Sequence, residues 1–348
     1  MLGKKTQSLA VALALLAAAE LGLRALESRA AGELPADRPV VLVLGSSRAK
    51  AGVAPRAIEQ VLAQRGHPNA FAANLSIEGA TAVGLYRRYH EELAPLAPVP
   101  PEGQAVLLIE ARGSGLNDSY VTPEEAVWLE RMRVERNASG QATDVAPVGP
   151  LALYREGRFA AGSRALVGLL ALARADELLR GAWPWSPGRG GAAPEDAGAP
   201  PGLEADWAHG ERGFLPYSDV PEPGLREPMW RAHYQGTLLK DFHTGGLQTD
   251  FLRLLVRQAR ADGFRPVLFI MPVTPLHRGF FPPGAYAAYL VHVAGVAALE
   301  GVPLVDLDSG LSLDVESFVD THHLRFSAVA PATVELTQRG VLPSLAGP

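Results

Sequence analysis

The sequence predicts an α/β protein built around a single doubly wound parallel sheet of about five strands. Short apolar runs with strand character alternate with longer helical segments on both sides of the middle of the chain. These runs are apolar almost throughout, which is typical of parallel strands covered by helices on both faces. Polar residues follow directly after several runs, at the edge of such a sheet where ligands bind.

Strands and helices are expected to alternate along most of the chain. The strands are expected at residues 40–44, 70–75, 105–110, 265–271 and 302–307. The helices are expected at residues 55–66, 81–93, 122–134, 246–262, 285–300 and 327–340. The third helix has the clearest start, because Thr122 can cap it, Pro123 suits its first position and Glu125 completes a capping box.

The middle of the chain interrupts this alternation without ending it. Residues 137–230 are an expected insertion with a loop-like start, an Ala- and Leu-rich helix at 160–179 and a stretch at 181–201 dominated by Gly, Ala and Pro. That last composition buries too little apolar surface to fold by itself, so the stretch is predicted to be disordered. We therefore expect one α/β domain at residues 39–348 that contains this helical and disordered insertion.

Residues 1–38 have the features of a membrane-targeting segment followed by a short linker. Two lysines precede an apolar run at 9–19, which extends to residue 26 if Glu20 and Arg24 are included. These two charges lie four residues apart on one helical face, where they can pair near a membrane interface. The pattern favours an uncleaved signal anchor with the remaining chain outside the cytoplasm. Secretion after cleavage at residues 28–30 is the alternative.

Composition excludes several classes of function. The 348 residues are 47% hydrophobic, carry a net charge of −5 and contain no long basic run, so binding to nucleic acid is not expected. The absence of cysteine rules out disulfides, cysteine nucleophiles and Cys-ligated zinc. The histidines show no metal-ligand spacing, so neither a metal nor another cofactor is expected.

The residues of a nucleophilic site follow the first and last strands. Ser47 lies just past the strand at 40–44, and Asp320 lies three residues before His323 in the loop after the last strand. An imidazole can take the proton of a serine hydroxyl, and a carboxylate can orient that imidazole. Because the carboxyl ends of parallel strands share one edge, we expect the three residues to meet. His322 is the rival base, but the spacing from Asp320 favours His323.

Four blocks of sequence together resemble the SGNH, or GDSL-like, hydrolase superfamily. The blocks are Gly45-Ser46-Ser47, Asn74-Leu75-Ser76-Ile77-Glu78-Gly79, Gly115-Leu116-Asn117-Asp118 and Asp320-Thr321-His322-His323-Leu324. The resemblance covers most of the chain outside residues 1–38 and 137–230, and it implies the flavodoxin-like sheet of an SGNH hydrolase. The N-terminal segment and Met271-Pro272-Val273-Thr274-Pro275 make the chain similar to membrane-tethered members, such as alginate O-acetylation and teichoic-acid D-alanylation proteins.

The resemblance implies a role for each matching residue. Ser47 is the expected nucleophile, His323 the base and Asp320 the residue that orients it. The oxyanion hole is expected from the backbone N–H groups of Ser47 and Gly79 and from the side chain of Asn117. Three further residues within or near these blocks are expected to bind substrate: Arg48, Asn74 and Arg112.

The expected function is that of a serine esterase or acyltransferase acting at the cell envelope, on an acyl ester or an acylated envelope glycan. Hydrolysis and transfer stay open, because both proceed through the same acyl-enzyme. A non-catalytic binding or scaffold protein with this fold, acting in envelope polysaccharide modification, is the alternative from a different class. Contact between Ser47 and His323 distinguishes the two classes, since a base must reach the proton it removes.

Overall fold

The computed structural model describes residues 34–35, 37–94, 104–138, 140, 142–147, 214 and 223–346. At its centre is a five-stranded sheet in the order β2-β1-β3-β6-β7, with every pair of neighbours parallel. The strands are β1 Val40–Leu44, β2 Phe71–Asn74, β3 Ala105–Glu110, β6 Arg265–Ile270 and β7 Leu304–Asp306. The predicted fold class and all five expected strands are confirmed.

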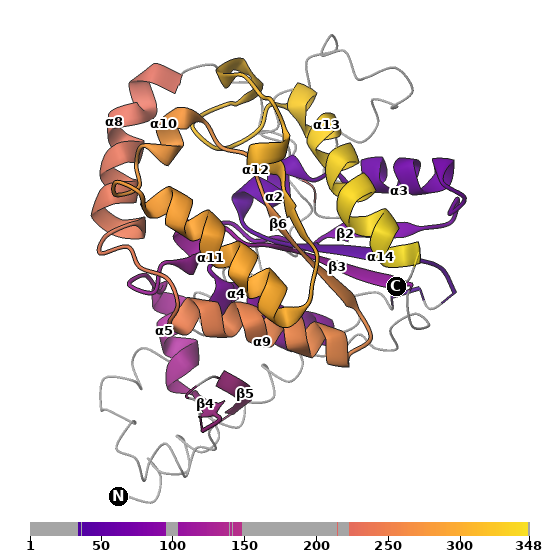
Figure 1. Cartoon of the computed structure of the whole chain (residues 1–348), viewed down its shortest axis with the longest axis horizontal. Coiled ribbons are helices and arrows are strands. Elements are labelled where there is room, and N and C mark those ends of the chain that lie inside the picture. The colour runs from indigo at the N-terminus through magenta and orange to yellow at the C-terminus, as the bar shows by residue number, and fades with distance from the viewer. Residues whose placement is uncertain are drawn as a thin grey trace, which may run out of the picture.

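The sheet is buried on both faces because its side chains alternate between two hydrophobic cores. Along β1, Val40, Leu42 and Leu44 enter one core, and Val41 and Val43 enter the other. The first core packs under α4 Ala82–Arg88, α9 Leu247–Ala261 and α11 Ala285–Glu300; the second packs under α3 Pro55–Gln64 and α13 Phe326–Leu336 (Figure 1). This two-sided burial explains why the strands are apolar at nearly every position.

Shorter elements complete the described fold. The short α-helices are α2 Ser47–Gly52, α5 Pro123–Glu130, α8 Pro223–His233, α10 Pro275–Arg278, α12 Leu307–Gly310 and α14 Leu342–Ala346. Single π-helical turns extend three of the helices, at Tyr89–Leu93, Tyr234–Leu238 and Thr337–Val341. Two 3-10 turns lie at Ser114–Leu116 and Val315–Ser317.

The strand order determines where a ligand can bind. From β1 the chain winds outward first to β2 and then, in the other direction, to β3 and β6. The reversal opens a crevice at the carboxyl ends of β1 and β3, which is the usual ligand site in such sheets. Ser47 follows β1, and Arg112 follows β3.

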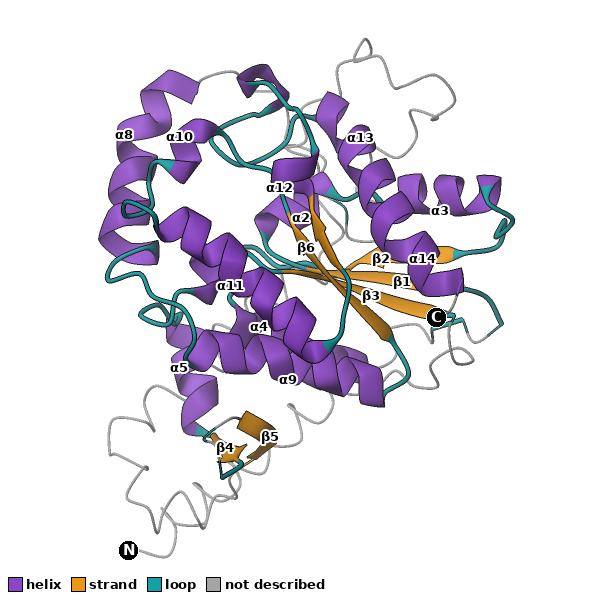
Figure 2. Ribbon diagram, viewed as in Figure 1, coloured by secondary structure: helices purple, strands orange, loops and turns teal. Residues whose placement is uncertain are grey.

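The predicted helix at 122–134 is correct at its start and wrong at its end. The capping box is present, with Thr122 Oγ1 accepting from the N–H of Glu125 and the Glu125 carboxylate accepting from the N–H of Thr122. The helix ends at Glu130, and β4 Met132–Arg136 then pairs antiparallel with β5 Ala142–Pro147, which was expected to be a loop. This hairpin lies apart from the main sheet and packs against α5 and α9 (Figure 2). Pairing of Val134 with Val145, rather than local propensity, makes the segment a strand.

The expected limits of the insertion, 137 and 230, fall within segments that the structure describes. Residue 137 lies in the connection of the β4–β5 hairpin, and residue 230 lies inside α8. The predicted helix at 160–179 and the predicted disorder at 181–201 fall outside the described residues. The N-terminal segment at 1–33 does so as well, and no helix within the described part of the chain is long and apolar enough to cross a membrane.

Candidate active site

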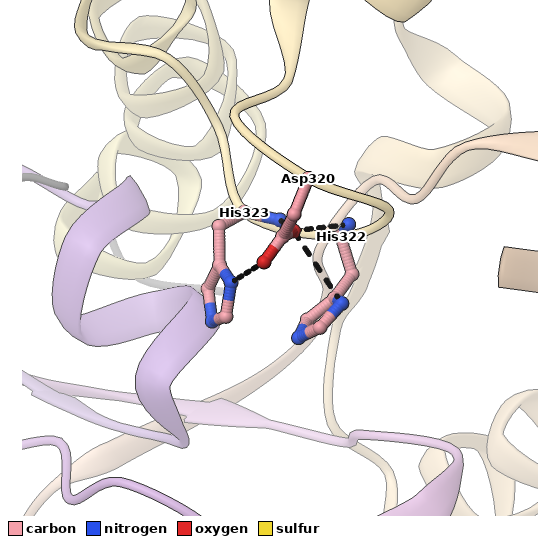
Figure 3. A group of neighbouring side chains, drawn as sticks. All are labelled: Asp320, His322 and His323. Atoms are coloured by element: carbon pink, nitrogen blue, oxygen red, sulfur yellow. Dashed lines mark hydrogen bonds and ion pairs between the residues drawn. The ribbon is translucent and has the colours of Figure 1, made fainter. Parts of the chain in front are cut away.

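Ser47, His323 and Asp320 form one continuous hydrogen-bonded array. Ser47 Oγ lies 2.9 Å from His323 Nε2, although the two residues are 276 positions apart. His323 Nδ1 lies 2.8 Å from Asp320 Oδ2 (Figure 3). Because an ionised carboxylate can only accept, Nδ1 carries the imidazole proton and Nε2 is left to accept from the Ser47 hydroxyl. The three residues therefore have the geometry of a nucleophile, its base and the group that orients the base.

The loop between β7 and α13 holds Asp320 and His323 in place. The other oxygen of Asp320, Oδ1, accepts from the backbone N–H groups of His322 and His323, at 2.8 and 2.9 Å. Thr274, which follows β6, donates through both its N–H and its hydroxyl to the carbonyl of Thr321, at 3.0 and 2.8 Å. Burial raises the pKa of Asp320, but hydrogen bonds and charge from His323 and the two N–H groups outweigh it and hold that pKa below its usual value.

Glu110, the last residue of β3, holds the turn that carries Ser47. Its Oε2 accepts from the N–H and the hydroxyl of Ser46, at 2.6 and 2.8 Å. Its Oε1 lies 2.9 Å from Arg48 Nη2, in an ion pair whose side chains are 4% and 0% exposed for Arg48 and Glu110. Gly45 permits this approach, because a Cβ there would lie 2.8 Å from Glu110 Oε2. The expected substrate-binding role of Arg48 is therefore corrected: its guanidinium is buried against Glu110.

Two backbone N–H groups are available for an oxyanion. Ser47 begins α2, where the first N–H groups of a helix have no partner within the helix. Gly79 has a φ of +71°, and no acceptor for its N–H lies in the described part of the chain. The N–H of Ile77 donates to the carbonyl of Gly45 at 2.9 Å, which ties the Gly79 turn to the nucleophile turn. The structure leaves the expected roles of both N–H groups open to test.

Asn117 does not provide the third expected donor. Its Nδ2 donates to the carbonyls of Leu238 and Lys240, at 2.9 and 3.1 Å, and its Oδ1 accepts from the N–H groups of Ser119 and His243. An amide has two donor hydrogens, so both are occupied. Residues 111–114 separate β3 from this block and carry Asn117 toward the segment that follows α8. The oxyanion role expected for Asn117 is therefore corrected to a structural one.

Asn74 is likewise a structural residue rather than a substrate-binding one. The side chain is 1% exposed, and Nδ2 donates to the carbonyls of Ala49 and Val53, both at 2.8 Å. Its Oδ1 accepts from the N–H of Ser76 at 3.1 Å. These bonds fasten α2 to the end of β2, because the Asn74 amide holds the carbonyl of Val53 at the helix end and shares the carbonyl of Ala49 with the N–H of Val53.

Arg112 is the one expected substrate-binding residue that stays a candidate. Its Nη2 donates to the hydroxyl of Tyr234 at 3.4 Å, and that hydroxyl lies 3.3 Å from His322 Nε2. The guanidinium makes no ion pair within the described residues. A positive charge therefore lies beside the two adjacent histidines of the C-terminal loop.

The only clustered metal-ligand types in the described residues are those of the same loop. Ligand atoms of Asp320, His322 and His323 lie within 4.8 Å of one another. The Asp320 oxygens are occupied by His323 and two backbone N–H groups, and the nitrogens of His322 by Thr321 and Tyr234. The hydrogen bonds account for the whole cluster, and we assign it no metal.

Sequence reasoning assigned no individual role to several residues that surround the site. Glu110 had a signal, since it is a charged residue at the end of an otherwise apolar strand. Tyr234 had none, because it follows the insertion and reaches the site only through tertiary packing against His277 and His322, at ring-centroid distances of 4.6 and 5.5 Å. His277 is 3% exposed and packs within 4.8 Å of His322.

No family model and no curated protein matches the chain. Among solved structures, it is similar to TesA at 14% identity, covering 88% of this chain and 99% of that one, with a TM-score of 0.38. It is similar to a GDSL-like lipase from Bacteroides thetaiotaomicron at 9% identity, 92% and 95% coverage and a TM-score of 0.39. A lipase/acylhydrolase from Enterococcus faecalis matches at 10% identity, 86% and 96% coverage and a TM-score of 0.38.

Proposed function

We propose that the protein is a serine esterase or acyltransferase that forms an acyl-enzyme on Ser47. The observation that carries this proposal is the contact of 2.9 Å between Ser47 Oγ and His323 Nε2, with His323 held by Asp320 at 2.8 Å. A hydroxyl is a weak nucleophile unless a base takes its proton, and this arrangement provides the base and its orientation. The acylhydrolases among the similar structures agree with this chemistry.

The steps follow from the positions of the donors. As Ser47 Oγ attacks the ester carbonyl, its proton moves to His323 Nε2, and the Asp320 carboxylate stabilises the imidazolium. His323 then gives the proton to the leaving alcohol, which leaves an acyl group on Ser47. Water, or the hydroxyl of an acceptor, attacks the acyl-enzyme with His323 again acting as base.

The tetrahedral oxyanion requires donors that are already in place. The N–H groups of Ser47 and Gly79 provide two of them, and each such donor contributes roughly 3–4 kcal/mol to the transition state. Asn117 is not among them, because its amide hydrogens bind Leu238 and Lys240. The oxyanion hole we propose thus consists of backbone N–H groups.

Labelling with a fluorophosphonate probe tests this function. The probe should phosphonylate Ser47 in the full-length protein, and Ser47→Ala should abolish the labelling and the hydrolysis of a short aryl ester. Ser46→Ala is the matched control, because Ser46 Oγ binds Glu110 and is not the nucleophile. Labelling that persists in Ser47→Ala rejects the proposal.

A non-catalytic binding or scaffold protein is the second candidate. The hydrogen bonds of the Asn117 amide to Leu238 and Lys240 favour this second candidate, because an oxyanion hole with fewer donors is a weaker catalyst. The binding or scaffold function would be the better account if the folded wild-type protein is not labelled by the probe and does not hydrolyse aryl esters.

We propose in addition that the enzyme acts outside the cytoplasm, attached to a membrane by its N-terminal segment, on an acyl ester or an acylated envelope glycan. The support is the apolar run at 9–26 behind two lysines. Incubation of the protein with an acetylated glycan as donor and a second sugar as acceptor distinguishes the two reactions. Free acetate indicates hydrolysis, and an acetylated acceptor indicates transfer.

A further inference from the structure

Two histidines compete for one carboxylate in the proposed active site. Figure 3 shows His322 and His323 on the same loop, both directed toward Asp320. Their ring centroids are 4.0 Å apart, and His322 Nδ1 is 3.5 Å from Asp320 Oδ1, against 2.8 Å between His323 Nδ1 and Oδ2. If His322 took up a proton, it would attract Asp320 and place a positive charge beside His323. Both effects would weaken His323 as a base.

A chain of hydrogen bonds fixes the state of His322. Arg112 can only donate, so the Tyr234 oxygen accepts from it at 3.4 Å and the Tyr234 hydrogen is free for His322 Nε2 at 3.3 Å. With Nε2 accepting, Nδ1 of a neutral His322 carries the hydrogen and donates to Thr321 Oγ1 at 2.9 Å.

The same chain continues beyond Thr321. The Thr321 hydroxyl then has its own hydrogen to donate, and His277 Nδ1 lies 3.2 Å away to accept it. The reverse arrangement, with the His322 hydrogen on Nε2, would leave the Tyr234 hydroxyl hydrogen without an acceptor among these groups, so the chain favours hydrogen on Nδ1. A chain of this kind selects a single tautomer of the imidazole within it.

The charges around His322 act in the same direction. The titratable and charged groups facing it are His323, His277, Arg112, Arg48, Asp320 and Tyr234. Asp320 is the single carboxylate among them, and it already accepts from His323 and two N–H groups. Burial and then the positive charges of the neighbours hold the pKa of His322 well below its usual value.

We propose that Arg112 and Tyr234 are positioning residues, which hold His322 in a neutral Nδ1–H form. The carboxylate of Asp320 then orients only the imidazole of His323. The inference deepens the proposed function, on which it rests, because it explains how the loop distinguishes the base from its neighbour. Tyr234 comes from the chain that returns after the insertion, so this segment contributes to the site through a hydrogen bond as well as through packing.

Imidazole ¹⁵N NMR of the full-length protein tests the inference without relying on turnover. The His322 signals are assigned by their loss in His322→Asn. We expect a neutral Nδ1–H tautomer at neutral pH and on mild acidification. In Tyr234→Phe, which keeps the ring, loss of the donor should raise the pKa of His322, so that it takes up its proton at a higher pH than in the wild type. Tyr89→Phe, which removes a buried hydroxyl bound to Asp262, is the control and should change nothing.

The second readout is the acid limb of the pH profile of kcat/KM for an aryl ester, which is the fall in kcat/KM as the pH is lowered. It should move up by about one pH unit in Tyr234→Phe, because a proton on either histidine then weakens the base. In the His322→Asn background, Tyr234→Phe should produce no further shift. A wild-type His322 with hydrogen on Nε2, or a Tyr234→Phe variant with lower kcat and an unchanged acid limb, overturns the inference. The expected tautomer in a protein without esterase activity would instead refute the proposed function alone.

Discussion

Asn117 and Leu238 are joined by a hydrogen bond of 2.9 Å across 121 residues of sequence. The same side chain binds Lys240 and accepts from two further N–H groups, so it fastens the segment after α8 to the turn after β3. It is fully buried. This one amide connects the residues around Tyr234 to the body of the domain.

Asn117→Ala should therefore lower stability rather than remove an oxyanion donor. Two carbonyls and two N–H groups lose their partner, which should cost about 1–3 kcal/mol for each group that stays buried and less for a group that water can reach. Urea unfolding measures this loss. At low temperature, where the variant is folded, the fluorophosphonate labelling rate of Ser47 should fall less than tenfold. A loss of 10²–10³ in turnover without a loss of stability would restore Asn117 to the oxyanion hole.

Removal of either the proposed nucleophile, Ser47, or the proposed base, His323, should abolish activity to a similar extent. Ser47→Ala eliminates acyl-enzyme formation, and His323→Ala should lose nearly as much because the two residues act as a unit. The double variant should be no worse than Ser47→Ala alone. Single-turnover hydrolysis of an aryl ester measures all three. Additive losses would show that the two residues act independently.

Asp320→Asn should leave the fold intact and lower turnover by about 10⁴, because an amide can stabilise the wrong imidazole tautomer.

The lowered pKa of Asp320 also predicts a pH effect on stability. The carboxylate stabilises the folded state above about pH 4, and this contribution is lost as the pH falls through the lower pKa of the folded protein. Unfolding free energies between about pH 2 and about pH 6 should show a smaller acid-side loss in the variant. Equal losses in both proteins would contradict the effect.

The buried ion pair of Glu110 and Arg48 should be essential for the nucleophile turn. Glu110→Gln leaves Arg48 buried without an opposite charge, which typically costs 3–5 kcal/mol, roughly, in unfolding free energy. Arg48→Met combined with Glu110→Gln should recover part of this loss, because no unpaired charge is left. Chemical denaturation of the three proteins gives the comparison. A double variant less stable than Glu110→Gln would show that charge is not the reason.

The N-terminal anchor is the prediction that concerns residues outside the described structure. The full-length protein should stay with membranes after a high-salt wash, and a version that starts at Glu33 should be released, because the apolar run at 9–26 provides the attachment. N-terminal sequencing of the mature protein is the decisive measurement. A mature chain that begins at Ala31 would identify a cleaved signal.

The sequence by itself determined the five-stranded sheet and the positions of Ser47, Asp320 and His323 on it. Apolar runs bounded by turns predict buried strands, and parallel topology brings their carboxyl ends to one edge, so residues 276 positions apart could be expected to meet. These conclusions follow from periodicity and connection rules, which are properties of short stretches of chain.

Only the tertiary structure decided the partners of the remaining polar groups. The sequence Gly115-Leu116-Asn117-Asp118 does not indicate whether Asn117 contacts a substrate or the carbonyl of Leu238. In the same way, the sequence around Arg48 does not indicate whether its guanidinium contacts solvent or Glu110. Met132–Arg136 is rich in charge and reads as helix until β5 pairs with it. A buried polar group must find a partner, and which partner it finds depends on segments far away in sequence that packing brings within about 3 Å.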